Sequence, residues 1–308
     1  MAGANQPGRF PGPPVTTALG QAELRQRDES IAALYPTDPA PSRDPFDHER
    51  RFLLSGAEET HFLDAIAPYA AFEIYNATKP ISYTRTTYFD TDDLSYCRAP
   101  RGEPARRLRV REYALAATPA DVPVLSGVAY VELKQNLGAA RSKVRLVAPP
   151  TELADLVERH GASGGSPLGS EAFALIAGQL AIPGMAPRIA TWYRRVCLTA
   201  ADRRVRITLD ENLTFCRPQA IGLAGVPAAP TAMDVVGVFP SRILEVKHCG
   251  EMPAWLHGAL ADLRGVPQFS KFRVGMQALG HDIEPPSERA TDDGLLSPLF
   301  TLQSFVAA

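Results

Sequence analysis

Charged side chains alternate with apolar ones in five short runs along the chain. These runs are Arg107-Leu-Arg-Val-Arg111, Glu132-Leu-Lys134, Lys143-Val-Arg145, Arg206-Ile-Thr-Leu-Asp210 and Glu245-Val-Lys247. Because successive side chains of a strand point to opposite faces, each run places its charges on one face and its aliphatic residues on the other. The pattern predicts a sheet with one charged face and one apolar face.

The wider pattern predicts the order of the elements. Ser55 and Glu58 form a capping-box sequence for a helix that ends near Tyr69. Strands are expected at 46–54, 81–89, 107–113, 129–135, 141–147, 188–198, 205–210 and 242–248, and further helices at 151–159, 170–180, 253–264 and 268–279. This order predicts an α+β fold with a mainly antiparallel sheet. If about eight strands close into a barrel, the charged face becomes a tunnel wall.

Composition limits the class of protein. The chain has 308 residues and a formal net charge of -2, which argues against a nucleic-acid-binding protein with a strongly basic domain. It contains no apolar run of membrane-spanning length, and its start lacks the order of a signal peptide. The four cysteines are widely spaced, so we expect reduced thiols in a cytoplasmic protein. Proline-rich residues 1–44 are expected to form a disordered tail, 45–281 the folded domain and 282–308 a C-terminal tail.

The signs of the alternating charges are unequal. The expected inner face carries four acids, Glu49, Glu132, Asp210 and Glu245, against eleven basic residues. So many like charges would destabilise a closed lumen unless an anion or water screened them, and a polyanionic ligand would resolve the conflict. The basic residues are Arg51, Arg107, Arg109, Arg111, Lys134, Arg141, Lys143, Arg145, Arg195, Arg206 and Lys247.

The acids suggest a metal beside the anion. Mg²⁺ or Mn²⁺ is typically held by one or two carboxylates together with substrate phosphates. Glu245 and Glu132 fit that role, with Glu49 and Asp210 behind them; for Glu49, an ion pair with an arginine is an equal alternative. The competing interpretation of the whole pattern is the solvated outer face of an open sheet. On such a face, however, positive and negative side chains should lie opposite one another on neighbouring strands, because like charges in those positions repel. The histidines show no ligand spacing, and Tyr193 is expected in the core or wall, where its hydroxyl could touch a ligand.

The ordered motifs resemble the VTC domain, the catalytic domain of the vacuolar transporter chaperone polyphosphate polymerase, within the triphosphate tunnel metalloenzyme superfamily. The matching pieces span about 46–279. They are Glu49-Arg-Arg-Phe-Leu-Leu, Tyr88-Phe-Asp-Thr with Leu94 and Tyr96, Arg107-Leu-Arg-Val-Arg-Glu-Tyr113, Glu132-Leu-Lys134, Lys143-Val-Arg145, Tyr193-Arg-Arg195, Arg206-Ile-Thr-Leu-Asp210, Glu245-Val-Lys247 and Ser270-Lys-Phe272.

The resemblance implies an eight-stranded antiparallel β-barrel, the triphosphate tunnel, with flanking helices. It implies a polymerase that transfers the γ-phosphoryl of ATP to a growing polyphosphate chain with Mn²⁺ or Mg²⁺. Glu245, Glu132 and Glu49 would hold the metal, and Lys247, Lys271 and Arg206 would be catalytic. The phosphate path would be lined by Arg51, Arg107, Arg109, Arg111, Lys134, Lys143, Arg145 and Arg195. The superfamily usually has Glu-x-Lys on the first strand, where this chain has Glu49-Arg-Arg51.

Three functions remain open on the sequence. If a terminal phosphate oxygen attacks the γ-phosphoryl group, the protein is a polymerase; if water attacks, it is an inorganic or nucleoside triphosphatase. A polyphosphate- or nucleotide-binding module without activity is the third. The carboxylate of Glu245 favours an enzyme, because pure anion binding would gain nothing from it.

Overall fold

The fold is described by a computed structural model that places residues 46–100, 105–137, 140–148, 150–159, 171–222 and 225–283. The expected tail 1–44, and all but two residues of the expected tail 282–308, lie outside these ranges. Ile283 is 5% exposed and packs in a hydrophobic cluster, so the packed fold continues past the expected boundary at 281. No described helix combines the length and apolar character needed to cross a membrane. All four cysteines are free.

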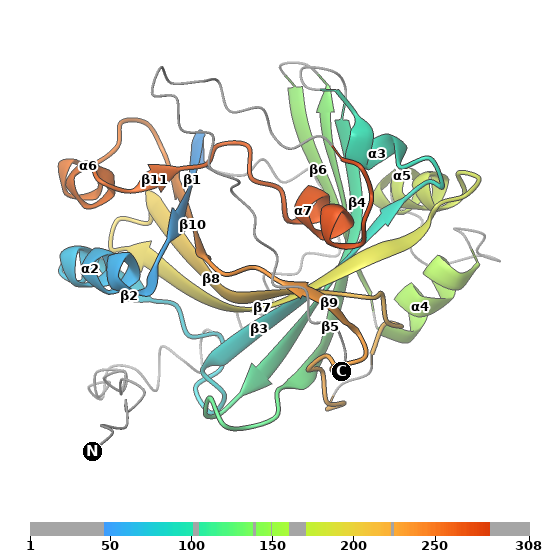
Figure 1. Cartoon of the computed structure of the whole chain (residues 1–308), viewed down its shortest axis with the longest axis horizontal. Coiled ribbons are helices and arrows are strands. Elements are labelled where there is room, and N and C mark those ends of the chain that lie inside the picture. The colour runs from blue at the N-terminus through green and yellow to red at the C-terminus, as the bar shows by residue number, and fades with distance from the viewer. Residues whose placement is uncertain are drawn as a thin grey trace. The chain divides into compact units, whose positions relative to one another are not determined.

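One mainly antiparallel sheet dominates the fold (Figure 1). Its order is β11-β1-β10-β8-β7-β3-β4-β5-β6, with β2 paired to β7 and β9 to β8. The predicted α+β class with an antiparallel sheet and flanking helices is therefore confirmed. The strands are β1 (His48–Leu54), β2 (Ala70–Phe72), β3 (Ile81–Asp90), β4 (Ala105–Ala116), β5 (Val124–Leu137), β6 (Ala140–Ala148), β7 (Ala186–Ala200), β8 (Val205–Cys216), β9 (Val235–Val238), β10 (Arg242–His248) and β11 (Arg264–Gly265).

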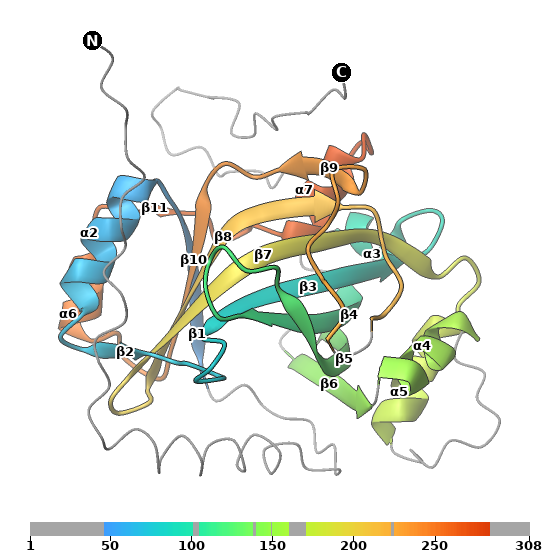
Figure 2. The same cartoon turned by 90° about the horizontal axis from the view of Figure 1, so that it is seen from below.

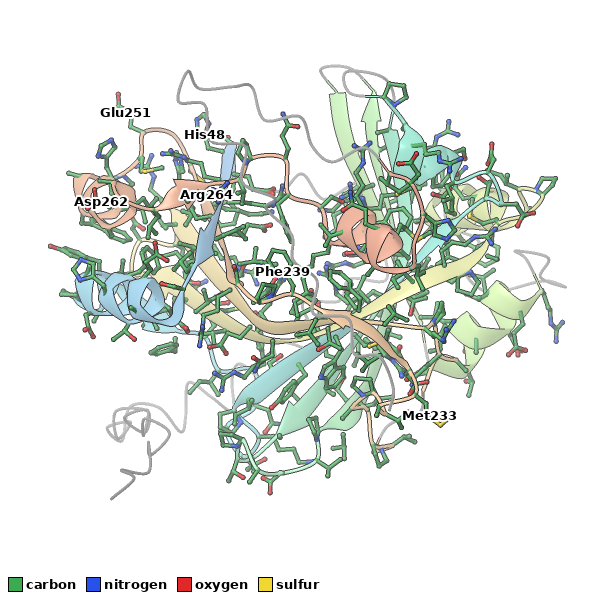
Figure 3. All side chains as sticks on the ribbon, in the orientation of Figure 1. His48, Met233, Phe239, Glu251, Asp262 and Arg264 are labelled. Carbon is green, nitrogen blue, oxygen red and sulfur yellow. The ribbon has the colours of Figure 1, made fainter. Side chains whose placement is uncertain are left out.

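The sheet is open, which corrects the expected closed eight-stranded barrel. In the ranges that the structure places, no ladder joins β1 to β6. The outer edge of β1 is instead taken at Phe52 and Leu53 by the short strand β11, so these residues are not available to β6. His48 and Arg264 mark these two neighbouring edge strands in Figure 3. Strands as short as β2, β9 and β11 carry too few residues for a periodicity and were not predicted.

The open sheet nevertheless curls strongly (Figures 1 and 2). Arg51 on β1 and Arg107 on β4 are five ladder steps apart in the strand order, which would be about 24 Å along a flat sheet. Burial, and then the positive charges of neighbours that include Arg109 and Arg51, lower the pKa of Arg107. Figure 1 shows helix α7 (Lys271–Ala278) between the two ends of the curled sheet, and Lys271 at its start contacts Asp210 on the charged side. The charged side is therefore concave.

Helices cover the convex, apolar side in two places. Helices α2 (Gly56–Ile66) and α6 (Ala254–Leu260) pack over β1, β10 and β8, where Phe62 and Leu256 share a cluster with Ile207. Helix α2 begins with the predicted Ser55–Glu58 capping box. Helices α4 (Pro150–Glu158) and α5 (Glu171–Leu180) cover β4, β5 and β6 in the same way. The aliphatic positions of the alternating runs thus form the convex core, as predicted.

Helix α7 (Lys271–Ala278) lies on the opposite, concave side and positions Lys271 there. The Ser270 hydroxyl accepts a hydrogen bond from the backbone N–H of Arg273 and caps the helix. Phe272 stacks on Tyr88 of β3 with 5.0 Å between ring centroids. Gly275 lets the helix approach the sheet, since a Cβ there would lie 2.9 Å from both Ile189 Cγ1 and Phe215 Cδ1. The short helix α3 (Ser95–Arg98) lies between β3 and β4 in sequence.

Replacing Gly275 therefore tests the docking of α7. Gly275→Ala is expected to lower the free energy of unfolding by about 1 to 3 kcal/mol, because both atoms that the methyl group meets belong to packed side chains. The matched control is Gly178→Ala in α5, where a Cβ would meet nothing within 4 Å. That change is expected to stabilise by up to about 1 kcal/mol through helix propensity alone. Urea unfolding midpoints of the two variants measure the contrast; equal shifts would mean that α7 has room to move.

Candidate functional site

The predicted site residues all lie in the described ranges, and alternation places them on the concave side of the sheet. We call this side the charged face, defined by Arg107, Arg109 and Arg111 of β4, Glu132 of β5 and Glu245 of β10. All predicted site residues are on strands except Lys271, which begins α7. The side chain of Arg141 lies outside the described part.

Glu132 is at the centre of one group of charges. Its side chain is 0% exposed, and Arg109 and Arg145 face it directly from β4 and β6. Arg109 Nη2 is 2.6 Å from Oε2, and Arg145 Nη2 and Lys143 Nζ are 2.6 and 2.9 Å from Oε1. Burial alone would raise the pKa of Glu132, but Arg109, Arg111 and the other cations hold it well below its usual range. The carboxylate is therefore ionised and enclosed by cations.

A row of like charges lies beside this group. Lys134 on β5 is opposite Arg107 of β4 and Lys143 of β6 in the strand register. The charge of Arg109, followed by burial, lowers the pKa of Lys134 to about 6. Lys247 of β10 contributes to the same shift. A bound anion would favour the protonated amine and relieve the repulsion along the row.

Glu245 is at the centre of a second group, on β1 and β10. It pairs with Arg51 in the register, and Arg51 Nε is 3.1 Å from Oε2. Arg51 also contacts Glu49, which lies 3.8 Å from the Nζ of Lys247. Burial would raise the pKa of Glu245, but Arg51, Arg195 and the nearby lysines lower it, so this carboxylate stays charged. Its side chain keeps 25% of its surface exposed, in contrast to Glu132.

Asp210 of β8 organises a third group. Both of its oxygens accept hydrogen bonds from Arg195, at 2.6 and 2.7 Å, and Lys271 Nζ contacts it from α7. The same ammonium lies 4.0 Å from the centre of the Tyr193 ring. Burial would raise the pKa of Tyr193, but Arg195, Lys271 and Arg111 lower it. The Tyr193 hydroxyl thus sits among cations, where it can donate to a bound oxyanion.

Arg206 faces Lys247 directly in the strand register, but its own hydrogen-bond and ion-pair partners come from another segment. Its Nη2 donates to the hydroxyl of Tyr75 at 3.1 Å and lies 3.8 Å from Glu73 Oε2. Both partners follow β2, in a segment that sequence patterns did not connect with the site. The catalytic role expected of Arg206 stays a prediction, although its neighbours indicate a position at one margin of the charged face.

Several buried polar atoms on the charged face have no hydrogen-bond partner in the described part. They are the hydroxyls of Thr84, Thr86 and Thr208 and the Nε atoms of Arg111 and Arg206. Buried polar groups normally find partners, so these atoms indicate bound water or a polar ligand. Thr84 and Thr86 were missed by the sequence analysis, because their run on β3 carries no alternating charge. They lie opposite Tyr113 and Arg111 in the register, which only the strand pairing reveals.

Part of the motif around Tyr88 serves the fold instead of the site. Asp90 is 0% exposed and accepts hydrogen bonds from the backbone N–H groups of Thr91, Tyr96 and Cys97. These bonds fix the turn between β3 and β4 through α3. The aspartate therefore has a structural task behind the site, and its oxygens are already engaged.

The chemistry of the donors decides which acids could hold a divalent metal. Within the described residues, no group of three or more His, Cys, Asp or Glu side chains gathers as a metal site. Glu245 and Glu49 both contact Arg51 and are each partly exposed, with 25% and 26% of their side-chain surfaces accessible. Two such carboxylates fit Mg²⁺ or Mn²⁺ when substrate phosphates supply further oxygens. The cations around them fit the phosphates.

Comparisons with known proteins identify the family of the chain. The family model described as the VTC domain matches residues 46–280. Subunit 4 of the vacuolar transporter chaperone complex of Schizosaccharomyces pombe is 31% identical over 117 residues, which is 32% of this chain and 16% of that protein. A structure from Bacillus halodurans described as an adenylate cyclase aligns with a TM-score of 0.37 and 16% identity, covering 78% of this chain and 93% of that one, too distant to bear on function. The match over most of its folded part shows that the chain belongs to the VTC domain family.

Proposed function

We propose that the protein is a metal-dependent polyphosphate polymerase that transfers the γ-phosphoryl group of ATP to a growing polyphosphate chain. One observation carries the proposal. The same concave face holds a row of positively charged side chains and an ionised, partly exposed carboxylate, that of Glu245. Membership of the VTC domain family supports the same activity. The S. pombe relative is matched over a small part of its length, so its biological role is not transferred.

Phosphoryl transfer asks the protein mainly to position groups and to neutralise charge. The guanidinium groups of Arg107, Arg111 and Arg195 can donate paired hydrogen bonds to phosphate oxygens. Lys134, Lys247 and Lys271 can add point charges from β5, β10 and α7. Together these residues would hold the triphosphate and the chain end in line on the charged face.

Glu245, with Glu49 beside it, would hold Mn²⁺ or Mg²⁺ against the phosphates. A bound divalent ion would neutralise part of the charge on the transferred group. The chain's own cations orient the triphosphate, and Arg51 contacts both carboxylates and holds them close together. The attacking group would be a terminal oxygen of orthophosphate, pyrophosphate or polyphosphate.

The test is incubation of the purified protein with ATP and either Mn²⁺ or Mg²⁺, followed by analysis of long-chain polyphosphate, ADP and orthophosphate. Chain growth with matching ADP release is the expected result. Release of orthophosphate without chains would replace the proposal by a triphosphatase. Tight triphosphate binding without turnover would replace it by a binding module.

Arg107 offers a direct test of phosphate binding. It is opposite Lys134, and no carboxylate pairs with it in the described part of the chain. Arg107→Ala is expected to weaken tripolyphosphate binding by about 1.5 to 3 kcal/mol, the range for hydrogen bonds to charged groups. The melting temperature of the variant should stay the same or rise, because burial and neighbouring positive charges already disfavour the charged form of Arg107. Calorimetric titration and thermal unfolding measure the two effects.

The matched control is Arg159→Ala, which removes the same charge from an exposed site beside α4 on the convex side. Its affinity for tripolyphosphate should stay at the wild-type value. Equal losses in the two variants would mean that net charge, and not a contact by Arg107, sets the affinity.

A further inference from the structure

Glu132 has no lone pair to spare for a metal ion. Arg109 Nε and Nη2 contact Oε2 at 2.8 and 2.6 Å. Arg145 Nε and Nη2 contact Oε1 at 2.9 and 2.6 Å, and Lys143 Nζ contacts it at 2.9 Å. A carboxylate offers about four lone-pair sites, and these contacts already use them. An incoming divalent cation would also meet the positive charges that enclose the carboxylate.

The same contacts connect three adjacent strands through one side chain. Glu132 is on β5, between Arg109 on β4 and Arg145 on β6, and both face it directly in the register. Without the carboxylate, these guanidinium groups would face each other across β5 as unpaired like charges. Like charges in such positions repel and would turn the side chains toward solvent.

The cations that Glu132 gathers stay available to a ligand. The side chains of Arg145 and Lys143 are 39% and 28% exposed, whereas Glu132 itself is 0% exposed. Arg145 gives Nε and Nη2 to Glu132, so its Nη1 donors are not committed to this carboxylate. The buried acid thus fixes cations whose outer surfaces face the site.

We propose that Glu132 is a positioning residue that fixes Arg109, Arg145 and Lys143 as one phosphate-binding array, and that it does not bind the metal. This role rests on the proposed function in one respect, because the proposed function identifies the ligand as a phosphate chain. It revises the metal-binding role that the sequence pattern suggested for Glu132. It also separates the acids of the charged face into an internal counter-ion on β5 and metal-binding candidates on β1 and β10.

The test is Glu132→Gln, which keeps the shape and removes the charge. The variant should melt at a lower temperature, and tripolyphosphate should raise its melting temperature more than that of the wild type, because the anion supplies the missing negative charge. The kcat should fall about 10- to 100-fold through misplaced cations, while the KM for ATP does not rise. The Mn²⁺ concentration for half-maximal binding, followed by electron paramagnetic resonance, should be unchanged.

Two variants make the test specific. Glu112→Gln removes another buried carboxylate, paired with Arg85 on the convex side. It should also lower stability, but tripolyphosphate should stabilise it no more than the wild type. If Glu132→Gln does not fold, the double variant Glu132→Gln/Lys143→Met, which removes one cation together with the acid, replaces it in the Mn²⁺ measurement, and that measurement alone then decides whether Glu132 binds the metal.

Each outcome decides the proposal. Weakened Mn²⁺ binding would overturn it in favour of a metal ligand. An unchanged kcat, or an equal effect of tripolyphosphate on Glu112→Gln and Glu132→Gln, would reduce Glu132 to a purely structural residue. If the wild-type protein shows no turnover, the proposed function fails, but the melting and Mn²⁺ measurements still test the role of Glu132.

Discussion

Glu245→Gln is expected to lower metal-dependent turnover by at least about 100-fold. Mutation of a residue that only hydrogen-bonds to a metal ligand already lowers metal affinity or activity by about 10- to 100-fold, so loss of a ligand itself should have a larger effect. The pair with Arg51 is only partly exposed, with 29% and 25% of the two side-chain surfaces accessible, so the free energy of unfolding should fall by more than the about 1 kcal/mol of an exposed pair and by less than the about 3 to 5 kcal/mol of a buried one. Initial rates across a Mn²⁺ series, with urea unfolding of the same samples, measure both quantities.

The matched control is Glu251→Gln, the same chemical change at an exposed residue shortly after β10. Figure 3 shows Glu251 beyond the strands, near α6. This variant should keep wild-type rates and Mn²⁺ dependence. Full metal-dependent activity of Glu245→Gln would remove Glu245 from the metal site, and a parallel Glu49→Gln variant would then show whether the neighbouring acid is the ligand.

The contrast between Glu132 and Glu245 shows how far sequence patterns reach. Both residues belong to a Glu-x-Lys run with an aliphatic residue between, so alternation correctly put both on one face. Their cross-strand neighbours differ: Glu132 lies between two arginines, whereas Glu245 lies between Arg51 and Thr208. That difference encloses one carboxylate and leaves the other partly exposed. It depends on strand order and register, which no single run specifies.

The strand order also explains the failure of the barrel prediction. The charges and aliphatic residues of each run predicted which strands exist and which side each residue faces. Closure depends on how the edge strands meet, and on β1 the two-residue strand β11 already occupies Phe52 and Leu53. Arg206 shows the same limit, since its partners Tyr75 and Glu73 come from a segment without a periodic pattern.

Asp210→Asn is expected to lower the free energy of unfolding by about 3 to 5 kcal/mol, the loss found when one partner of a buried ion pair is removed. Asp210 is 2% exposed and compensates both Arg195 and Lys271. The matched control is Asp92→Asn. Asp92 also pairs with an arginine, since Arg188 Nη2 is 2.7 Å from its Oδ1, but the Asp92 side chain is 81% exposed. The free energy of unfolding should therefore fall by less than about 1 kcal/mol in this variant. Urea unfolding at pH 7 compares the two variants.

The dependence of this loss on pH and on anions identifies its cause. Burial would raise the pKa of Asp210, but Arg195 and Lys271 lower it in the folded protein. Its stabilising contribution is therefore present above the unfolded-state pKa of about 4 and is lost as the pH falls through the folded-state value. The difference between wild type and Asp210→Asn should shrink below pH 4, and at pH 7 tripolyphosphate should restore part of the lost stability by neutralising Arg195 and Lys271. If the loss of unfolding free energy in Asp210→Asn depends on neither pH nor tripolyphosphate, Asp210 acts through packing. The positive charges of Arg195 and Lys271 would then be balanced by other groups on the charged face.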